Sequence, residues 1–357
     1  MTEHPIPGAT VARHETAMPW TPQAASRFMH TLRQELARHQ VGHPDPWGYG
    51  RRGAWVLVLC TLAWFFLPQA SGLKWGVLML LGTYAVAQGA AIGHEVGHRA
   101  VTNSARGSLV LGHLFMTVVV GMPYSAWQAR HRRHHLHPNS RHDPDIRPWI
   151  FSFHDADARA ATGLRRWFTR RQSRLMPPLA TLMGFSIKGS GWKAVLRSPG
   201  QHGLDIALLA VHLLLWVGLP AGVLGWAGAW LNYTVLTWLV GTYLALVFVP
   251  NHLGGSTSEA CAHWPPALRQ IVTARNLPDK PWLSHLWLGQ NSHIEHHAFA
   301  HFPATQLARA RAVTRTLCRA HGIPYRECTL REAMAEIQAH NRRMEALAQA
   351  KPQEPHP

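Results

Sequence analysis

The sequence has few cysteines, and their spacing excludes several kinds of site. Its four cysteines, Cys60, Cys261, Cys318 and Cys328, are spread over 357 residues, and none belongs to a CxxC motif. This spacing does not fit a disulfide framework, a thiolate zinc site or a cysteine-ligated iron–sulfur cluster. We therefore expect four free thiols with structural roles.

Acidic residues are also scarce. Asp and Glu together number 18, against 35 Lys and Arg, which gives a formal net charge of +17. A basic excess of this size suits an anionic partner, either nucleic acid or the surface of a membrane. The first twenty residues contain no apolar core of signal-peptide length, so we expect no cleaved secretion signal.

Long apolar runs favour the membrane as that partner. Residues 54–67 and 75–93 form one pair of runs, and residues 205–223 and 228–249 form a second pair separated by LGWAG. About 20 apolar residues cross a bilayer as a helix, so the first run requires a thin bilayer or a helix that starts before Gly53. The pattern predicts an all-α integral membrane fold with four transmembrane helices in two hairpins.

A fifth apolar run, Ser108–Met122, is only marginally long enough to span a bilayer and contains Gly112, His113 and Gly121. We interpret it as a re-entrant or interfacial segment. The turns inside the two hairpins contain a single basic residue, Lys74, whereas arginines flank the other ends of the spans. The positive-inside rule therefore places those ends and both termini in the cytoplasm.

The polar segments at the two ends complete the predicted organisation. Thr329 and Glu332 form a capping-box pattern that predicts a helix running to about Ala350, and we expect Lys351–Pro357 to be disordered. The predicted division is an N-terminal cytosolic segment, 1–50, a membrane domain, 51–320, and a C-terminal helix with a tail, 321–357.

Three motifs, or boxes, carry histidines three or four residues apart: HEVGH at 94–98, HRRHH at 131–135 and HIEHH at 293–297. Residues at this spacing share one face of a helix, so each motif aims two or three imidazoles at one point. Imidazole is a common ligand for zinc and for redox metals. Together with a histidine at the end of the last apolar run they make nine candidate ligands, which suits two ions better than one. The nine are His94, His98, His131, His134, His135, His252, His293, His296 and His297.

Polar residues next to these motifs are candidates for orienting the imidazoles. Asp143 and Asp145 follow the second motif, and Asn251 precedes His252. Carboxylates in such positions accept hydrogen bonds from ligating imidazoles, although a solvated Asp-Pro-Asp turn is an equal alternative. Five other histidines lack the spacing of the motifs, and we do not expect them to be ligands: His113, His137, His142, His285 and His301. Histidine coordination alone does not separate iron from zinc or manganese.

The order of the motifs resembles the membrane fatty acid desaturase family. The sequence PNHLG at residues 250–254, the stretch HHLHPN followed by DPD, and the segment TARNLPDKPWLSHLWLGQNSHIEHH are similar to the bacterial acyl and front-end desaturases of that family. The resemblance covers most of the chain. There are two departures: many relatives with this third box have Gln where His293 stands, and the usual HHLFP sequence is three residues longer here.

The resemblance implies the chemistry. It implies two iron ions held by the nine histidines in a cytosolic helical cap, and O₂-dependent introduction of a cis double bond into a long acyl chain carried by CoA, a carrier protein or a lipid. It also implies a multi-pass protein of the inner or plasma membrane, if bacterial, with the active site and both termini cytoplasmic. No nucleic-acid partner is expected.

The electrons are expected from a separate protein. The sequence contains no HPGG signature of a fused haem domain and no cysteine cluster, which points to a ferredoxin or a cytochrome. The basic cytoplasmic face is a candidate dock for an acidic donor, since complementary charge steers such encounters. Its candidate residues are Arg165, Arg166, Arg170 and Arg171.

Three other functions compete with desaturation. A related diiron hydroxylase or ketolase acting on a lipid, alkane or carotenoid would use the same cage of histidines. A membrane zinc metalloprotease could use HEVGH, with the glutamate as general base, but leaves two motifs unexplained. A non-enzymatic nucleic-acid-binding or metal-storage protein rests mainly on the net charge of +17.

Overall fold

The computed structural model describes residues 20–67, 70–146 and 150–350. Within these ranges the regular structure is helical, apart from one isolated β-bridge between Asn276 and Glu327. The predicted all-α class is therefore confirmed. The tail Lys351–Pro357, predicted to be disordered, lies outside the described residues.

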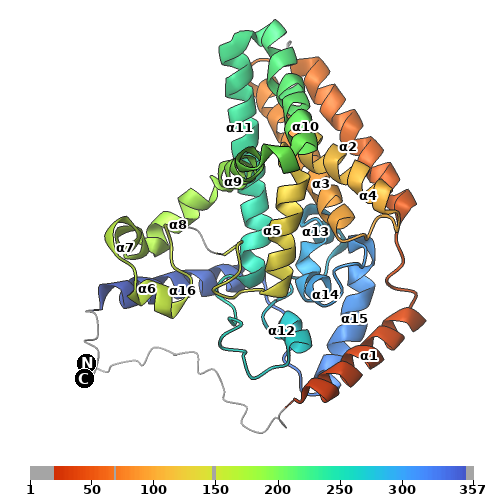
Figure 1. Ribbon diagram of the computed structural model, residues 1–357, viewed down its shortest axis with the longest axis vertical. Helices are drawn as coiled ribbons and strands as arrows, with labels where there is room; N and C mark the ends of the chain where they lie inside the picture. The colour runs from red at the N-terminus through yellow and green to blue at the C-terminus, as the bar shows by residue number, and fades with distance from the viewer. Residues whose placement is uncertain (1–19, 68–69, 147–149, 351–357) are drawn as a thin grey trace.

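The helices form an apolar bundle, a cap beneath it and a lobe at the side of the cap (Figure 1). The bundle contains α2 (Pro46–Phe66), α3 (Leu73–Gly97), α4 (Ala105–Gly112), the π-helical η2 (His113–Val119), α10 (Gly203–Leu213), η4 (Leu214–Gly218) and α11 (Leu219–His252). The cap contains α1 (Pro22–Arg38), α5 (Tyr124–Leu136), α12 (Pro266–Val272), α13 (Pro281–Leu286), η5 (Gln290–Ser292), α14 (His293–Ala298) and α15 (Ala304–Ala320). The lobe contains α6 (Asp155–Arg159), α7 (Gly163–Thr169), α8 (Gln172–Ala180) and α16 (Leu330–Gln349), with α9 (Met183–Arg197) and η3 (Pro199–Gln201) leading back to the bundle.

The first hairpin consists of α2 and α3. Helix α2 begins at Pro46, where the Asp45 carboxylate accepts a hydrogen bond from Gly48 N at 2.8 Å. It therefore starts before Gly53, which is one of the two alternatives that the short run 54–67 left open. The two helices run antiparallel, since Arg52 Nε near the start of α2 donates to Gln88 Oε1 near the end of α3 at 2.6 Å.

The second hairpin is an apolar helical segment, Gly203–His252, that turns back on itself at Gly225. Gly225 has φ 68° and ψ 164°, a conformation open to glycine but not to residues with a side chain. The two arms then pack side by side, and His212 Nε2 lies 2.9 Å from the Tyr233 hydroxyl. This position lies within the LGWAG turn that the sequence predicted.

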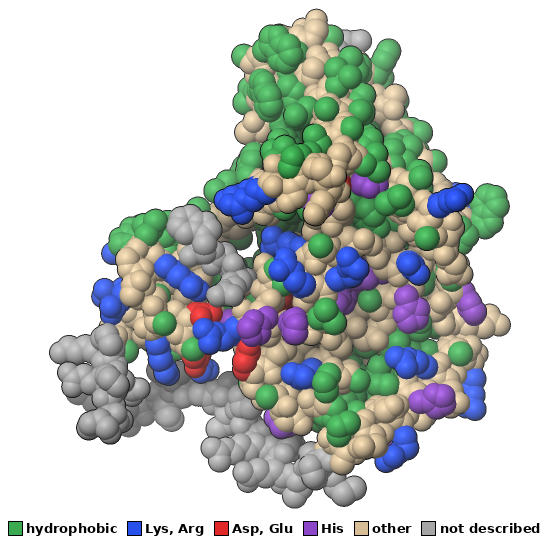
Figure 2. Space-filling model, in the orientation of Figure 1, with side chains coloured by type: hydrophobic (Ala, Val, Ile, Leu, Met, Phe, Trp, Pro, Cys, Tyr) green, Lys and Arg blue, Asp and Glu red, His purple; other side chains and the backbone are tan. Residues whose placement is uncertain are grey.

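Two helical segments in the described part of the chain are long and apolar enough to cross a membrane: Leu73–Gly97 and Gly203–His252. The bent pair Ala105–Val119 and Tyr124–Leu136 is a third candidate. Figure 2 shows hydrophobic side chains over the bundle, whereas Lys, Arg and His side chains gather over the cap and the lobe. This apolar surface suits lipid, while the count of four crossings and the cytosolic placement of the cap remain predictions.

The run Ser108–Met122 returns the chain to the end of the bundle from which it left. Helix α4 continues into η2, the chain turns at Gly121 with φ 80°, and α5 leaves at an angle of 104°. His98 Nε2, before this excursion, lies 2.8 Å from His131 Nε2, after it. The excursion through α4, η2 and α5 therefore begins and ends at the histidine cluster, and the re-entrant course of Ser108–Met122 in a membrane remains a prediction.

Side chains satisfy the carbonyl groups that this turn exposes. The Val118 carbonyl accepts from His212 Nδ1 at 2.8 Å and from Trp216 Nε1 at 3.2 Å, and the Gly121 carbonyl accepts from Trp192 Nε1 at 2.7 Å. Irregular backbone near a membrane requires such partners, because lipid offers none. The three side chains thereby fix the turn that leads into α5.

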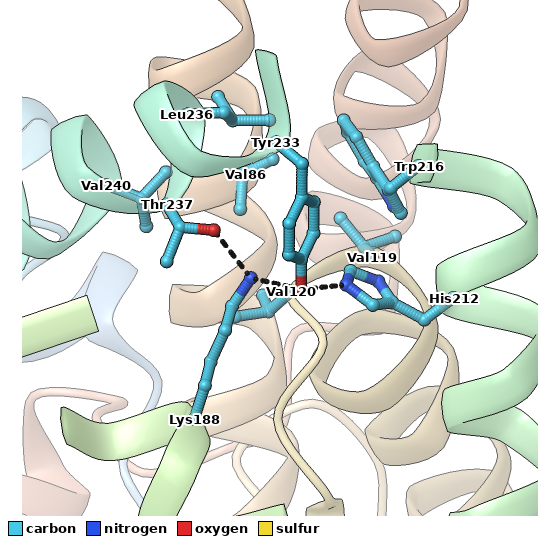
Figure 3. A pocket seen from close by; sticks show the side chains of 10 residues that line it. All are labelled: Val86, Val119, Val120, Lys188, His212, Trp216, Tyr233, Leu236, Thr237 and Val240. Carbon is cyan, nitrogen blue, oxygen red and sulfur yellow. Dashed lines mark hydrogen bonds between the residues drawn. The ribbon is translucent and has the colours of Figure 1, made fainter. Parts of the chain in front are cut away.

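A lysine extends this network (Figure 3). Because His212 Nδ1 donates to Val118, its Nε2 accepts from the Tyr233 hydroxyl, and the Tyr233 oxygen in turn accepts from Lys188 Nζ at 3.2 Å. Lys188 also donates to Thr237 Oγ1 at 3.2 Å. Burial lowers the pKa of Lys188 to about 7. The lysine thus links α9 to α11 and, through His212, to the turn.

The C-terminal helix agrees with the sequence prediction. The Thr329 side chain accepts from Glu332 N and the Glu332 side chain accepts from Thr329 N, which completes the capping box of α16. Helix α16 packs on α8, where Gln172 Nε2 donates to Asn341 Oδ1 at 2.9 Å. At the other end of the chain, α1 packs with α12 and α15 in a separate hydrophobic cluster of the cap.

Candidate metal centre

The histidine motifs meet where the bundle joins the cap. The first motif lies at the end of α3, the second on α5, His252 at the end of α11, and the third on α14. Four helices from distant parts of the chain therefore bring their imidazoles together. Potential ligand atoms lie within 4.8 Å of one another in two groups of four: His94, His98, His131 and His296, and His134, His252, His293 and His297.

The ninth predicted ligand, His135, lies between the two groups. Its Nε2 atom is 3.1 Å from His131 Nε2, and its ring is stacked on His297 with centroids 4.5 Å apart. All nine predicted histidines therefore belong to one continuous cluster. Their assignment as ligands rests on this geometry and on the chemistry of their nitrogen atoms.

In the second group, each ring is held by an acceptor outside the cluster. His134 Nδ1 donates to Asp143 Oδ2 at 2.9 Å and His252 Nδ1 donates to the Thr273 carbonyl at 3.2 Å. His293 Nδ1 and His297 Nδ1 meet Gln290 Oε1 at 3.0 Å and Gln270 Oε1 at 3.1 Å. The Gln270 amide orientation is fixed, because its Nε2 donates to the His135 carbonyl at 2.8 Å.

These acceptors determine where the imidazole protons lie. Carbonyl and carboxylate oxygens cannot donate, so each Nδ1 carries the proton and each Nε2 presents a bare lone pair. The Nε2 atoms nevertheless approach closely: His252 lies 2.8 Å from His293 and from His297, and His134 lies 3.3 Å from His297. Converging lone pairs repel unless a cation lies between them.

A metal ion accounts for this arrangement. Imidazole nitrogens about 2.0–2.1 Å from an ion in tetrahedral geometry stand about 3.3 Å apart, close to the separations found here. In the first group, His94 Nε2 and both nitrogens of His296 are buried without a hydrogen-bond partner among the described residues. A neutral imidazole has one nitrogen with a free lone pair, so His94 and His296 can each offer one such nitrogen to a metal ion. The residues therefore fit a pair of metal ions.

Electrostatics favours the neutral form that metals require. Burial and then the neighbouring imidazoles hold the pKa values of His131, His135, His296 and His297 well below the ordinary histidine range. His134 differs: burial lowers its pKa, but the charge and hydrogen bond of Asp143, together with the charge of Asp145, outweigh burial and leave the pKa raised. For Asp143, burial raises the pKa, but His134, the backbone N–H of Asp145 and the charge of His252 together lower it, so this carboxyl is ionised.

The three predicted orienting residues lie in different surroundings. Asp143 is fully buried and hydrogen-bonded to His134. Asp145 pairs with Arg130 at 2.6 Å and lies 3.8 Å from His134 Nδ1. Asn251 donates to the Val247 carbonyl within α11, and its side chain contacts no motif histidine among the hydrogen bonds of the described residues. Of the three, Asp143 has the contact that the sequence argument required.

Several residues next to the cluster were not among the predicted ones. Thr273 and Gln270 lie on or beside α12, remote in sequence from every motif, so no spacing pattern pointed to them. Gln290 precedes His293 by three residues, which a helical-spacing argument could have detected.

The histidines excluded on spacing lie outside both groups. His113 faces Asp205, 3.7 Å away, and His285 contacts Tyr84 on α3. His142 is exposed and its nearest aromatic neighbour is His137, with ring centroids 6.0 Å apart. His301 packs against Phe302. None of the five appears in a group of potential metal ligands.

Comparison with known proteins agrees with this geometry. The profile of the family described as "Fatty acid desaturase" matches residues 70–329, which is well over half of the chain and includes all nine histidines. The chain belongs to the fatty acid desaturase family. Desaturases are oxidoreductases. Membership of this family, together with the apolar helices, indicates that the chain is a membrane protein.

Curated relatives of this desaturase family member are distant in sequence. Fatty acid desaturase 3 of Bos taurus is 23% identical over 86% of this chain and 70% of its own length. The sn-1 oleoyl-lipid 12-desaturase of Anabaena variabilis is 24% identical, over 72% of this chain and 71% of its own. An acyl-lipid (9-3)-desaturase of Physcomitrium patens is 25% identical over 69% of this chain, and the match spans about half, 49%, of that protein.

Proposed function

We propose that this desaturase family member introduces a cis double bond into a long acyl chain, using oxygen and two iron ions held by the nine clustered histidines. The observation that supports the proposal is the convergence of imidazole nitrogens from four helices, which bound metal ions would explain. The acyl substrate is supported by the names of the relatives, two of which are described as acting on acyl lipids.

Bound iron supplies the reductive activation of oxygen that cleavage of an unactivated C–H bond needs. The protein's part is to hold the ligands, position the chain and exclude water. The rings of His134, His252, His293 and His297 are fixed by their hydrogen bonds to Asp143, Thr273, Gln290 and Gln270. Fixed rings avoid reorganisation when charge on the metals changes.

An apolar layer on the bundle side of the histidines provides the water-excluded side of the site. Ile92 and Val96 are buried on the same helix as the first motif, and Met116 packs against Gly93. Trp127 stacks on His131 with centroids 4.7 Å apart, and Phe248 lies 6.3 Å from the His94 ring. An acyl chain approaching from the bundle therefore meets hydrocarbon walls up to the imidazoles, which keeps bulk water from the reacting carbons.

The orientation and the electron source belong to the same proposal. The site and both termini lie on the cytoplasmic side, in accord with the arginines that flank the hairpins, and the four arms of the two hairpins cross the membrane. A separate acidic donor, a ferredoxin or a cytochrome, docks on the basic lobe. Of the predicted dock residues, Arg170 and Arg171 are exposed there, as is the neighbouring Arg174. Arg165 and Arg166 donate to the carbonyls of Phe151 and Ala348.

Lipid analysis of an expressing host tests the function. We expect new unsaturated acyl chains, located by mass spectrometry of their double bonds, that are absent when His296→Ala is expressed at equal level. Separate analysis of phospholipid and thioester pools identifies the acyl carrier. If the host instead accumulates hydroxylated or keto products and no unsaturated ones, the enzyme is an oxygenase that uses the same histidine cluster.

A further inference from the structure

The two groups of histidines differ in how firmly their rings are held. We call the group His134, His252, His293 and His297 the anchored site, and the group His94, His98, His131 and His296 the open site. In the anchored site all four Nδ1 atoms have hydrogen-bond acceptors, at 2.9, 3.2, 3.0 and 3.1 Å. One of these acceptors, Asp143, is a buried carboxylate.

The open site has almost none of this support. His94 Nδ1 has one acceptor, Glu95 Oε1, at 3.2 Å on the adjacent residue. His296 Nδ1 is buried without a partner, and the Nδ1 atoms of His98 and His131 have no hydrogen bond in the described part of the chain. His135, whose Nε2 is nearest to this site, has no acceptor for its Nδ1 among those residues either.

Solvent access differs in the same direction. All four residues of the anchored site are buried, whereas His98 and His131 of the open site are only half-buried, as is His135. Water and a competing chelator therefore reach the open site more easily. Support and burial are independent observations, and both distinguish the same two groups.

Ring anchoring translates into metal affinity. An acceptor on the far nitrogen fixes the tautomer and orientation of a ligating imidazole and raises its basicity, and losing one such partner costs about 10–100-fold in affinity. A site whose rings are already oriented also loses less conformational freedom when it binds. The anchored site should therefore bind at least about tenfold more tightly than the open site.

We infer that this chain loads its two metal ions in sequence, with the anchored site binding first and retaining its ion, and the open site binding second and exchanging it. This inference rests on the proposed function, because it takes the nine histidines as ligands. Sequential loading predicts an intermediate form of the protein that holds one ion per chain, at the anchored site. Asp143, Gln270 and Gln290 are then positioning residues for the first ion.

Anaerobic titration of the metal-free protein with Fe²⁺ in detergent tests the inference. Iron bound per chain is measured by equilibrium dialysis and elemental analysis against a graded chelator. We expect two binding steps separated by at least about tenfold. Asp143→Asn should weaken the first step by about 10–100-fold, because the amide replaces the charged acceptor of His134.

Asp145→Asn is the matched control, since this neighbouring carboxylate pairs with Arg130 and is 3.8 Å from His134. It should change the dissociation constant of the first step by less than about threefold, which is well below the roughly 10–100-fold change expected when an anchoring partner is lost. If Asp143→Asn does not elute as a folded protein, Gln290→Leu makes the same test through His293. A single step with two equivalent ions, or equal effects of Asp143→Asn and Asp145→Asn, overturns sequential loading. A protein that binds no iron overturns the proposed function itself.

Discussion

The Tyr49 hydroxyl on α2 donates a hydrogen bond to Oε2 of Glu95, the carboxylate inside the first histidine motif, at 2.8 Å. The Ala304 N–H at the start of α15 donates to the same oxygen, also at 2.8 Å. Glu95 is thereby directed at α2 and α15. The third motif has a parallel arrangement, in which Tyr325 and Asn276 donate to Glu295 at 2.7 and 2.9 Å.

These contacts indicate that Glu95 holds α2, α3 and α15 together. In a zinc protease the glutamate of HEVGH would instead act as a general base. We predict that Glu95→Gln keeps turnover within about tenfold, because its amide oxygen still accepts from Tyr49 or Ala304, whereas losing a general base costs about 10²–10⁴-fold. Turnover and iron content are measured together on the purified variant. A protein with full iron and turnover reduced a thousandfold would assign Glu95 to proton transfer.

The boundaries of the ligand set can be tested with two histidines of the same chain. We predict that His297→Ala loses bound metal and all product, because its Nε2 lies within 3.3 Å of the Nε2 atoms of His134, His252 and His293. His142→Ala should keep both, since His142 is exposed and outside both groups. Iron content and acyl products are compared at equal expression. An inactive His142→Ala beside an active His297→Ala would refute the ligand assignment.

Lys188 should make stability depend on pH. Its pKa is about 7 in the folded protein and 10.5 as the ordinary value. Between these values the unfolded chain binds the proton and the folded protein does not, so stability rises with pH from about 7 upward. Below pH 7 the lysine is charged in both states, so the folded protein bears the full free-energy cost of burying the charge and its stability no longer changes with pH through this group.

Thermal unfolding of the purified protein between pH 7 and 9 measures this effect. We expect Tm to increase with pH in the wild type and to increase less in Lys188→Met, which has no titrating amine. Lys193→Met, on the same helix, serves as the control and should keep the wild-type slope. Equal slopes in wild type and Lys188→Met would show that the ammonium is solvated.

The proposed donor dock is confined to exposed arginines. We predict that Arg170→Glu with Arg174→Glu raises KM for an acidic donor severalfold and weakens the salt dependence of turnover, since complementary charge acts mainly on association. Arg309→Glu on α15 changes the charge of an exposed arginine outside the lobe and should have little effect. An equal change in KM for Arg309→Glu and for the double variant would show that the donor does not dock on α7 and α8.

The sequence was sufficient for the features that depend on local pattern. Gly225 lies in the LGWAG turn between two apolar runs, and the capping box of Thr329 and Glu332 opens α16. The histidine motifs were recognisable because three- and four-residue spacing puts imidazoles on one helix face. The early start of α2 was one of the two alternatives that the length of a membrane helix left open.

The remaining features depend on contacts between segments far apart in the chain. Gln270 and Thr273 reach the imidazoles only because α12 folds beneath α14, and no local spacing encodes that approach. Lys188 finds its partners in α11 in the same way. The difference between the anchored and the open site depends in part on these tertiary acceptors, whereas Asp143 and Gln290 lie close in sequence to the histidines that they orient.

Elemental analysis of the protein, purified anaerobically from an iron-replete host, tests the central claim most directly. The account predicts two iron ions per chain, reduced to fewer by His134→Ala, His252→Ala or His297→Ala and unchanged by His142→Ala. Protein that retains no iron, or that carries zinc in its place while forming unsaturated acyl chains, would contradict it.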